Sequence, residues 1–341
     1  MQCLLTNCYS VRYNCTFYNY ESIPREKRRN LGPGIILLLC YFIFELLYVP
    51  CIVVFAQKKN IRESCYKLLL FMGLVSMVNI HSGCLLIGTY AVRGDVFCDR
   101  PLFNYIVGMA VFAFYTCECM VSVILALNRC IAMLNDHLAR ALFDGAKVYI
   151  WIGISICYGI FMGFFFIPPM PNGMVVGYFW QAHIGYIDDT EGWYQHLLFP
   201  YHNFTVALSI PTFYLILYFM MRKKSMTVGS STTAAAAAAQ QQNRQQNSSE
   251  RKRNKNIFLQ VLFIGILTMA FAFLYVYIEY FPVSPWFIVF AHFSWASSQG
   301  LFAIIMITLN SHIRRSIKAV FIEPTLSRLT SHANSTINQA N

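Results

Sequence analysis

Seven long apolar stretches restrict what this chain can fold into more than any other feature. They lie at about 33–56, 66–91, 102–134, 147–168, 198–221, 257–281 and 285–309. Each is long enough to cross the hydrocarbon core of a bilayer as one helix, which needs roughly twenty residues. Apolar residues make up 57% of the chain and charged residues only 12%, outside the usual range of soluble domains. The sequence therefore predicts an all-α membrane protein with a seven-transmembrane helix bundle.

The ends of the chain are expected to lie on opposite sides of the membrane, because the number of spans is odd. The first apolar stretch begins near Leu31, exceeds the length of a signal-peptide core and lacks a small-residue cleavage site, so we expect it to remain as the first span. This gives an amino-terminal segment of residues 1–32, a bundle of residues 33–309 and a tail of residues 310–341.

The distribution of Lys and Arg predicts which side is which. Nineteen of the 26 fall in 57–67, 129–147, 222–256 and 310–341, and seven fall in 1–32 and 92–101. Basic loops stay in the cytoplasm, so we expect an outside amino terminus and a cytoplasmic carboxyl terminus. The basic cluster from Arg25 to Arg29 opposes this orientation.

The loop at 222–256 is of low complexity, with six consecutive alanines and a Gln/Asn run between two basic groups. The basic groups are interpreted either as positive-inside anchors or as contacts with an acidic partner or membrane lipids. The net charge of +11 is divided among short loops, which argues against a nucleic-acid partner.

Short motifs in a fixed order carry a family resemblance. They are Tyr13-Asn14-Cys15-Thr16, Ser64-Cys65-Tyr66-Lys67, Val96-Phe97-Cys98, Leu127-Asn128-Arg129-Cys130, Pro200-Tyr201-His202-Asn203, Tyr280-Phe281-Pro282 and Leu309-Asn310. The set, from about Tyr13 to Arg315, resembles the nematode serpentine chemoreceptors of class T (Srt). The resemblance implies a bundle of the G-protein-coupled receptor type in the plasma membrane, which binds a small molecule such as an odorant-like chemical cue and activates a heterotrimeric G protein.

One candidate set for G-protein coupling lies at the predicted cytoplasmic ends of the spans. The resemblance gives Arg129 the place of an arginine that engages the G protein, and Asn128 stands beside it where an acid would form an ionic lock. The alternative is an arginine that only anchors the helix at the interface. The full set is Asn128, Arg129, Arg253, Lys255, Asn310 and Arg314.

Polar residues inside otherwise apolar spans predict a ligand pocket in the outer half of the bundle. Glu118 must face the interior, because a carboxylate in hydrocarbon costs a few kcal/mol or more, either as a ligand or switch group or as a structural hydrogen-bonding group. His292, Trp295 and Gln299 share one helical face. The predicted pocket is Tyr105, Phe112, Glu118, His202, Tyr275, Glu279, His292, Trp295 and Gln299, although each alone could be a packing residue.

Four cysteines lie on the predicted outer side: Cys3, Cys8, Cys15 and Cys98. They allow three pairings, and free thiols are an alternative. The resemblance favours Cys15 with Cys98. Asn14 heads an Asn-X-Thr glycosylation sequon on the same side, and no cysteine spacing indicates a metal site.

A ligand-gated channel or transporter is the competing hypothesis, motivated by the intramembrane acids Glu45, Glu118 and Glu279. It predicts inverted repeats or broken helices, which the sequence does not display. Enzymatic motifs are missing, so we expect neither catalysis nor a cofactor. A dimer stays open from the sequence.

Overall fold

The computed structural model describes residues 12–16, 20–185, 187, 192, 194, 196, 198–227, 266, 269–271, 273–278, 281 and 283–323. Among them, six helices are long and apolar enough to cross a membrane, and a shorter apolar helix covers Met269–Ile278. Most of the predicted sixth span and the candidate residues Glu279, Arg253 and Lys255 lie outside the described residues, as do Cys3 and Cys8. The six long helices begin and end within a few residues of the predicted spans.

The membrane helices are α4 (Leu31–Phe55), α7 (Pro101–Leu134), α9 (Lys147–Phe165), α10 (Leu198–Thr227), α12 (Pro285–Leu309) and a second span made of α5 (Ser64–Ile80), η2 (His81–Leu86) and α6 (Ile87–Arg93). Shorter elements are η1 (Tyr20–Ser22), α3 (Arg25–Arg28), η3 (Phe97–Asp99), α8 (Asp136–Phe143), α13 (Ser311–Ile317) and η5 (Lys318–Ile322). Strands β1 (Met170–Asn172) and β2 (Gly177–Phe179) form an antiparallel pair. The sequence did not predict this hairpin.

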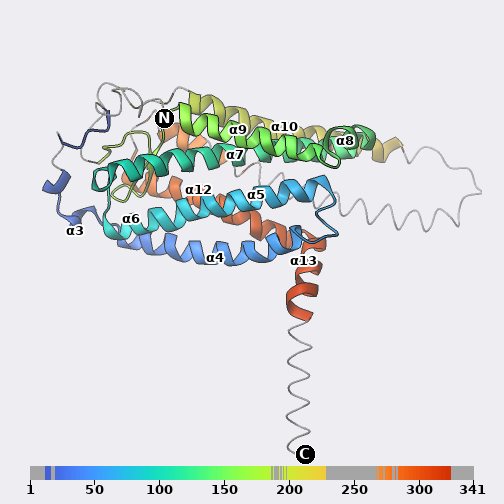
Figure 1. Cartoon of the computed structure of the whole chain (residues 1–341), viewed down its shortest axis with the longest axis horizontal. Helices are drawn as coiled ribbons and strands as arrows, with labels where there is room; N and C mark the ends of the chain where they lie inside the picture. Colours follow the sequence, from blue (N-terminus) through green and yellow to red (C-terminus); the bar gives the residue numbers. More distant parts are fainter. Residues whose placement is uncertain are drawn as a thin grey trace, which may run out of the picture.

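The long helices run side by side along the molecule, with α3 at one end of the bundle and α8 and α13 at the other (Figure 1). We call the end that carries α3 the hairpin end, because β1 and β2 pack there against α6, α7 and α12. The opposite end is the α8 end. The first membrane helix, α4, starts at the hairpin end, and the last, α12, ends at the α8 end, where α13 follows it. A chain that enters at one end and leaves at the other agrees with the odd number of spans expected from the sequence.

Close packing of α9 against α7 depends on two glycines one turn apart. A Cβ at Gly159 would lie 2.5 Å from the carbonyl oxygen of Ala113, and a Cβ at Gly163 would lie 2.6 Å from that of Met109. Small residues let membrane helices approach until their backbones touch, which replaces the hydrophobic driving force that lipid cannot supply. The result places α7, with its candidate residues, near the centre of the bundle.

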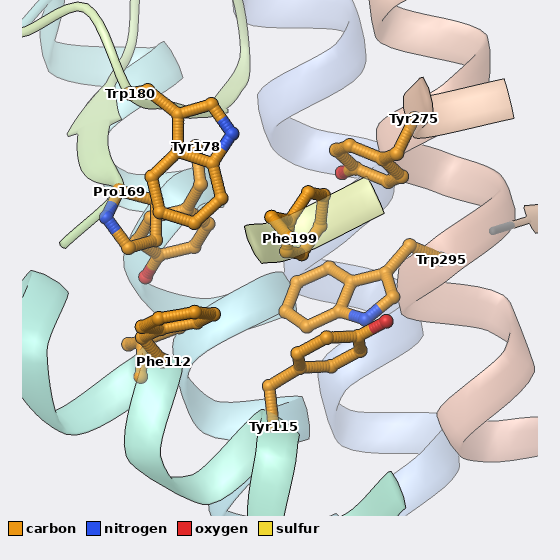
Figure 2. A pocket seen from close by; sticks show the side chains of 9 residues that line it. Phe112, Tyr115, Pro169, Tyr178, Trp180, Phe199, Tyr275 and Trp295 are labelled. Carbon is orange, nitrogen blue, oxygen red and sulfur yellow. The ribbon is translucent and has the colours of Figure 1, made fainter. Parts of the chain in front are cut away.

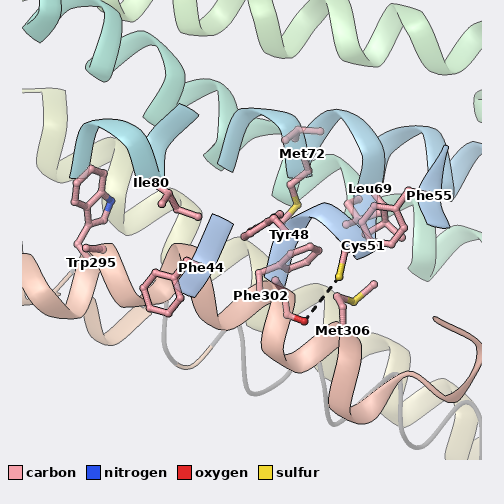
Figure 3. Close-up of a cluster of buried hydrophobic side chains, with 14 of the residues drawn as sticks. Phe44, Tyr48, Cys51, Phe55, Leu69, Met72, Ile80, Trp295, Phe302 and Met306 are labelled. Carbon is pink, nitrogen blue, oxygen red and sulfur yellow. Dashed lines mark hydrogen bonds between the residues drawn. The ribbon is translucent and has the colours of Figure 1, made fainter. Parts of the chain in front are cut away.

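Apolar side chains divide between an inner and an outer surface. Tyr48, Phe55 and Leu68 are fully buried in a core that joins α4, α5 and α12 (Figure 3), whereas Leu46 on α4 is 74% exposed. A large exposed apolar surface is unstable in water and natural in lipid, so the exposure supports the membrane assignment.

A turn of π-helix interrupts the second span at His81–Leu86. Such turns insert extra backbone into an α-helix, rotate the faces that follow and often occur at functional sites. In this protein the π-turn places Gly83 against the ring of Trp295: a Cβ added at Gly83 would lie 2.8 Å from that ring. The span then ends at Gly94, whose positive φ of 73° suits a glycine cap.

Candidate functional site

A cavity of about 60 Å³ opens within the bundle near the hairpin end (Figure 2). One water needs roughly 10–15 Å³, so the cavity exceeds the space of a single water. Its walls come from α7, the hairpin, the start of α10, the helix Met269–Ile278 and α12. The lining residues are Val111, Phe112, Tyr115, Pro169, Tyr178, Trp180, Phe199, Tyr275 and Trp295.

Aromatic rings dominate the walls and hold one another in place. Trp180 lies edge-on to Phe112, with ring centroids 5.2 Å apart, and 4.9 Å from Phe199. Across the cavity, Tyr115 and Trp295 are 6.2 Å apart, also edge to face. Such pairs are worth about 0.5–1.5 kcal/mol beyond their buried area, so the walls are preorganised for an apolar guest.

Hydrogen bonds fix the tyrosines that line the cavity. The Tyr115 hydroxyl donates to Asn203 Oδ1 at 3.0 Å, and the Tyr178 hydroxyl donates to the Ser82 carbonyl at 3.1 Å. His292 Nε2 lies 2.9 Å from the Gly83 carbonyl, so this nitrogen carries the proton. The other ring nitrogen can then accept from the Tyr275 hydroxyl at 3.4 Å. His292 therefore positions a lining residue from behind the wall.

The hairpin that supplies Tyr178 and Trp180 is tied to both neighbouring spans. Asn30, just before α4, donates through Nδ2 to the Gly173 and Met174 carbonyls at 3.0 and 2.8 Å. The Gly173 amide donates to the Asp95 carbonyl at 2.8 Å, and a Cβ at Gly173 would lie 2.1 Å from the Tyr90 carbonyl oxygen. The hairpin thus covers the cavity as a fixed lid.

A disulfide between Cys15 and Cys98 ties the amino-terminal segment to η3, just before α7. This is the pairing that the resemblance favours. Tyr13 inserts beside it, 2% exposed, with its ring 5.0 Å from Tyr105 and 5.6 Å from Phe97. The segment Arg12–Thr16, which we call the strap, therefore packs on the hairpin end of the bundle.

His183 anchors the strap from the loop that follows the hairpin. Its Nε2 lies 3.3 Å from the Arg12 carbonyl, which also accepts from the Tyr194 hydroxyl. The imidazole is 1% exposed, and burial lowers the pKa of His183 to about 4. Cys15 and Cys98 share this neighbourhood, but their sulfurs are bonded to each other and cannot act as thiolate metal ligands.

The basic cluster that opposed the predicted orientation has a structural explanation. Arg28 is 4% exposed, and its Nη1 lies 3.6 Å from Asp99 Oδ2, while Arg25 lies 3.8 Å from the other carboxylate oxygen. Asp99 also accepts from the Val96 amide at 2.8 Å. Two charges of the cluster therefore pair within the protein rather than with anionic lipid, so they say little about membrane sidedness.

Glu118 lies deeper in the bundle than the aromatic cavity. It accepts hydrogen bonds from the Ser76 hydroxyl and the Asn79 amide of α5, and it borders a second cavity of about 70 Å³ with Gln299 and Ser122. Tyr115, Tyr275 and Trp295 line both cavities. We call the aromatic cavity the upper cavity and the one beside Glu118 the lower cavity. Because these three rings form a wall shared by both, a movement of the rings in the upper cavity can reach the surroundings of Glu118.

The predicted pocket residues separate into three groups. Phe112, Tyr275 and Trp295 line the upper cavity, and Glu118 and Gln299 line the lower one. The remaining described candidates lie outside the lining: Tyr105 packs under the strap, His202 bonds to the Tyr158 hydroxyl at 2.7 Å, and His292 supports Tyr275.

Sequence reasoning missed the residues that the hairpin supplies. Tyr178 and Trp180 come from the loop 169–197, where no periodic pattern signals a strand, and Asn203 looked like part of a motif rather than a partner of Tyr115. On α10, His202 is buried, whereas Thr205 is exposed and its hydroxyl bonds to the Tyr201 carbonyl of its own helix.

The candidates at the α8 end are mostly engaged in helix structure. Asn128 is 3% exposed, and its side chain reaches Ser64 Oγ at 3.3 Å. Asn310 caps α13 by accepting from two amides of its first turn, and Arg314 donates to the Thr308 carbonyl at the end of α12. Arg129 follows Asn128 and is partly exposed.

The intramembrane acids that motivated a channel lie in separate places. Glu45 pairs with His81, whose side chain is 50% exposed on the outer surface, whereas Glu118 is buried among α5, α7 and α12 side chains. Each described acid thus has its own local partners.

Comparison with known proteins identifies the family. The model of the serpentine type 7TM GPCR chemoreceptor family Srt matches residues 1–330. The chain belongs to this family. It is 23% identical over 317 residues to serpentine receptor class T-55 of Caenorhabditis elegans, covering 92% of this chain and 81% of that receptor.

The fold is also that of a solved seven-helix receptor. The crystal structure of squid rhodopsin matches with a TM-score of 0.64 at 13% identity, covering 88% of this chain and 86% of that chain. The protein is therefore a multi-pass membrane receptor of the G-protein-coupled type, and its family is one of receptors rather than enzymes.

Proposed function

We propose that this receptor detects a small, uncharged and largely apolar molecule in the aromatic cavity at the hairpin end, and activates a heterotrimeric G protein at the α8 end. The single observation that carries the proposal is the cavity itself, closed by Trp180 of the hairpin and floored by Tyr115 and Trp295. Small-molecule sites are concave and mostly apolar with a few fixed polar groups.

The chemistry of the lining gives the class of ligand. No lining residue in the described part of the chain carries a charge, so an ammonium or carboxylate would lose its hydration without gaining a partner. The polar groups of the side chains are three phenol hydroxyls and two indole N–H groups, and the hydroxyls of Tyr115 and Tyr178 already have partners. A ring or short chain with one hydrogen-bonding group suits these walls.

The orientation that goes with this function has the amino terminus outside and the carboxyl terminus in the cytoplasm. The positive-inside distribution supports it, and so does the disulfide, since disulfides persist in oxidising compartments. Epitope tags at the two ends, stained in intact and permeabilised cells, test it directly. A tag exposed only at the carboxyl terminus would contradict the receptor arrangement and favour a channel, which current recording would then test.

The ligand site is tested by a pair of tryptophan variants in cells with a G-protein readout and a panel of uncharged volatile compounds. Trp180→Ala removes a cavity wall, and Trp286→Ala removes a tryptophan that is 74% exposed at the start of α12. Loss of one aromatic contact of about 1–3 kcal/mol corresponds to a loss of potency of roughly 5-fold to 140-fold. We expect this loss for Trp180→Ala alone. Equal responses from both variants would place the ligand elsewhere.

Coupling is tested at the other end of the bundle. Arg129→Ala is expected to abolish G-protein activation at normal surface expression. The matched control is Arg140→Ala, which removes an exposed arginine paired with Asp136 on α8. Intact signalling in Arg129→Ala would leave this arginine with an anchoring role only.

Glu118→Gln tests the link between the two cavities. The substitution preserves side-chain size and removes the carboxylate that Ser76 and Asn79 bond, so we expect altered ligand potency with normal surface expression. Unchanged potency would remove Glu118 from the response.

A further inference from the structure

The walls of the upper cavity contain hydrogen-bond donors that the protein itself does not use. The protons of the three lining tyrosines are already donated, to Asn203, to the Ser82 carbonyl and to His292. By contrast, the indole N–H groups of Trp180 and Trp295 donate to no residue that the structure describes. One indole comes from the hairpin and the other from α12 (Figure 2). Two walls of the cavity therefore each carry an unused donor.

A buried imidazole behind Trp180 is a third unused donor. His196 Nδ1 accepts from the Phe199 amide at 3.0 Å. Burial lowers the pKa of His196 to about 4, so the ring is neutral near pH 7 and its proton is on Nε2. That nitrogen is buried and has no hydrogen-bond partner among the described groups. The ring centroid lies 4.4 Å from that of Trp180 and 5.4 Å from that of Phe112, and both of these rings line the cavity.

Asn203 supplies a fourth donor, beside Tyr115. Its Oδ1 accepts the Tyr115 proton, whereas its Nδ2 has no partner in the part of the chain that the structure describes. The residue is 2% exposed. A donor that is withdrawn from water and meets no acceptor is unfavourable. Four donors in and behind the walls of one cavity therefore lack an acceptor, and a guest that brings one would be stabilised there.

We propose that the ligand of the upper cavity is a small carbonyl compound, such as a ketone or an ester, whose oxygen accepts a hydrogen bond from the indole N–H of Trp180 or Trp295. This inference rests on the proposed function, because it names the class of molecule for the same cavity. A carbonyl oxygen has two lone pairs and no proton of its own, so it pairs with a donor without adding another one. A site with buried donors also rejects analogues that lack the acceptor, because the donors then stay unpaired.

Cyclohexanone and methylenecyclohexane test the class of ligand, because they have nearly the same shape and differ in carrying C=O or C=CH2. Saturation binding of each compound to the purified full-length receptor is measured, with empty detergent micelles as the blank. The ratio of the two affinities is then compared with the ratio of their partition from water into heptane, which has no donor. We expect the receptor to favour the ketone by at least ~2-fold beyond that partition ratio. An affinity ratio equal to the partition ratio would overturn the inference.

Conservative variants test the two indole donors. Trp180→Phe and Trp295→Phe remove the N–H and keep an aromatic ring, and Trp286→Phe is the matched control at a tryptophan that is 74% exposed. We expect the preference for the ketone over the hydrocarbon to fall ~2- to 12-fold, the value of one neutral hydrogen bond, in at least one lining variant and to stay unchanged in the control. An unchanged preference in both lining variants would overturn the role of the indoles.

Trp180→Ala distinguishes failure of this inference from failure of the proposed function. If neither affinity changes in Trp180→Ala, both compounds bind elsewhere, and the proposed site itself is wrong. If both affinities fall in Trp180→Ala but the preference for the ketone is the same in every phenylalanine variant, the site stands and only the carbonyl assignment is wrong. The inference is supported when both affinities fall in Trp180→Ala and the preference falls in a lining phenylalanine variant.

Discussion

Replacing Cys15 and Cys98 together by serine is expected to destabilise the hairpin end of the receptor. The disulfide closes a loop of sequence separation 83, for which loop-closure entropy gives about 4.5 kcal/mol. The loop contains α4 and the second span, which stay helical in the bilayer, so the unfolded chain gains less freedom than a soluble one. We therefore expect about 2–4 kcal/mol, or a melting temperature lower by roughly 5–10 °C.

A thiol-reactive dye measures this unfolding in detergent, because free cysteines such as Cys51, Cys65 and Cys84 are buried and react only when the bundle opens. The double serine variant adds no new thiol. Cys157→Ser, which removes an exposed free cysteine, is the matched control and should melt as the unmodified receptor does. An unchanged melting temperature in the double variant would refute the assignment of the strap as a stabilising element.

Three further predictions concern buried groups. Burial lowers the pKa of His183 to about 4 from an unfolded value near 6.5, so between these pH values the unfolded chain binds more protons than the folded one. The contribution of His183 to stability is therefore complete above about pH 6.5 and falls by up to ~1.4 kcal/mol per pH unit towards pH 4. His183→Gln should flatten part of that slope in melting curves. Gly163→Val should cost about 1–3 kcal/mol by forcing α9 away from α7, whereas Gly153→Val, at an open position, should be tolerated. Asn104→Leu removes the donor to the Val96 and Phe97 carbonyls and should cost about 2–4 kcal/mol in the same assay, and stability equal to the unmodified receptor would contradict that account.

Several residues of the candidate site were predictable from the sequence, and the reason is helical periodicity. Trp295 and Gln299 occupy one face of α12, and both border the cavity beside Glu118. Tyr105 on α7 was predicted to line the pocket in the same way, yet it lies under the strap. The Cys15–Cys98 disulfide holds the strap against the bundle, so that Tyr13 packs on Tyr105. A helical pattern says which side chains share a face, but contacts from distant segments decide what each face meets.

The sequence by itself determined that the chain crosses a membrane as a helical bundle and where most spans begin and end. An apolar segment of about twenty residues satisfies its backbone hydrogen bonds in lipid only as a helix. It also placed Glu118 inside the bundle, since a carboxylate is costly in hydrocarbon. Only the tertiary structure decided that Trp180 closes the cavity, that Arg28 pairs with Asp99, and that Glu45 pairs with His81. These contacts join residues far apart in the chain, and their geometry depends on helix rotation, the π-turn and the hairpin.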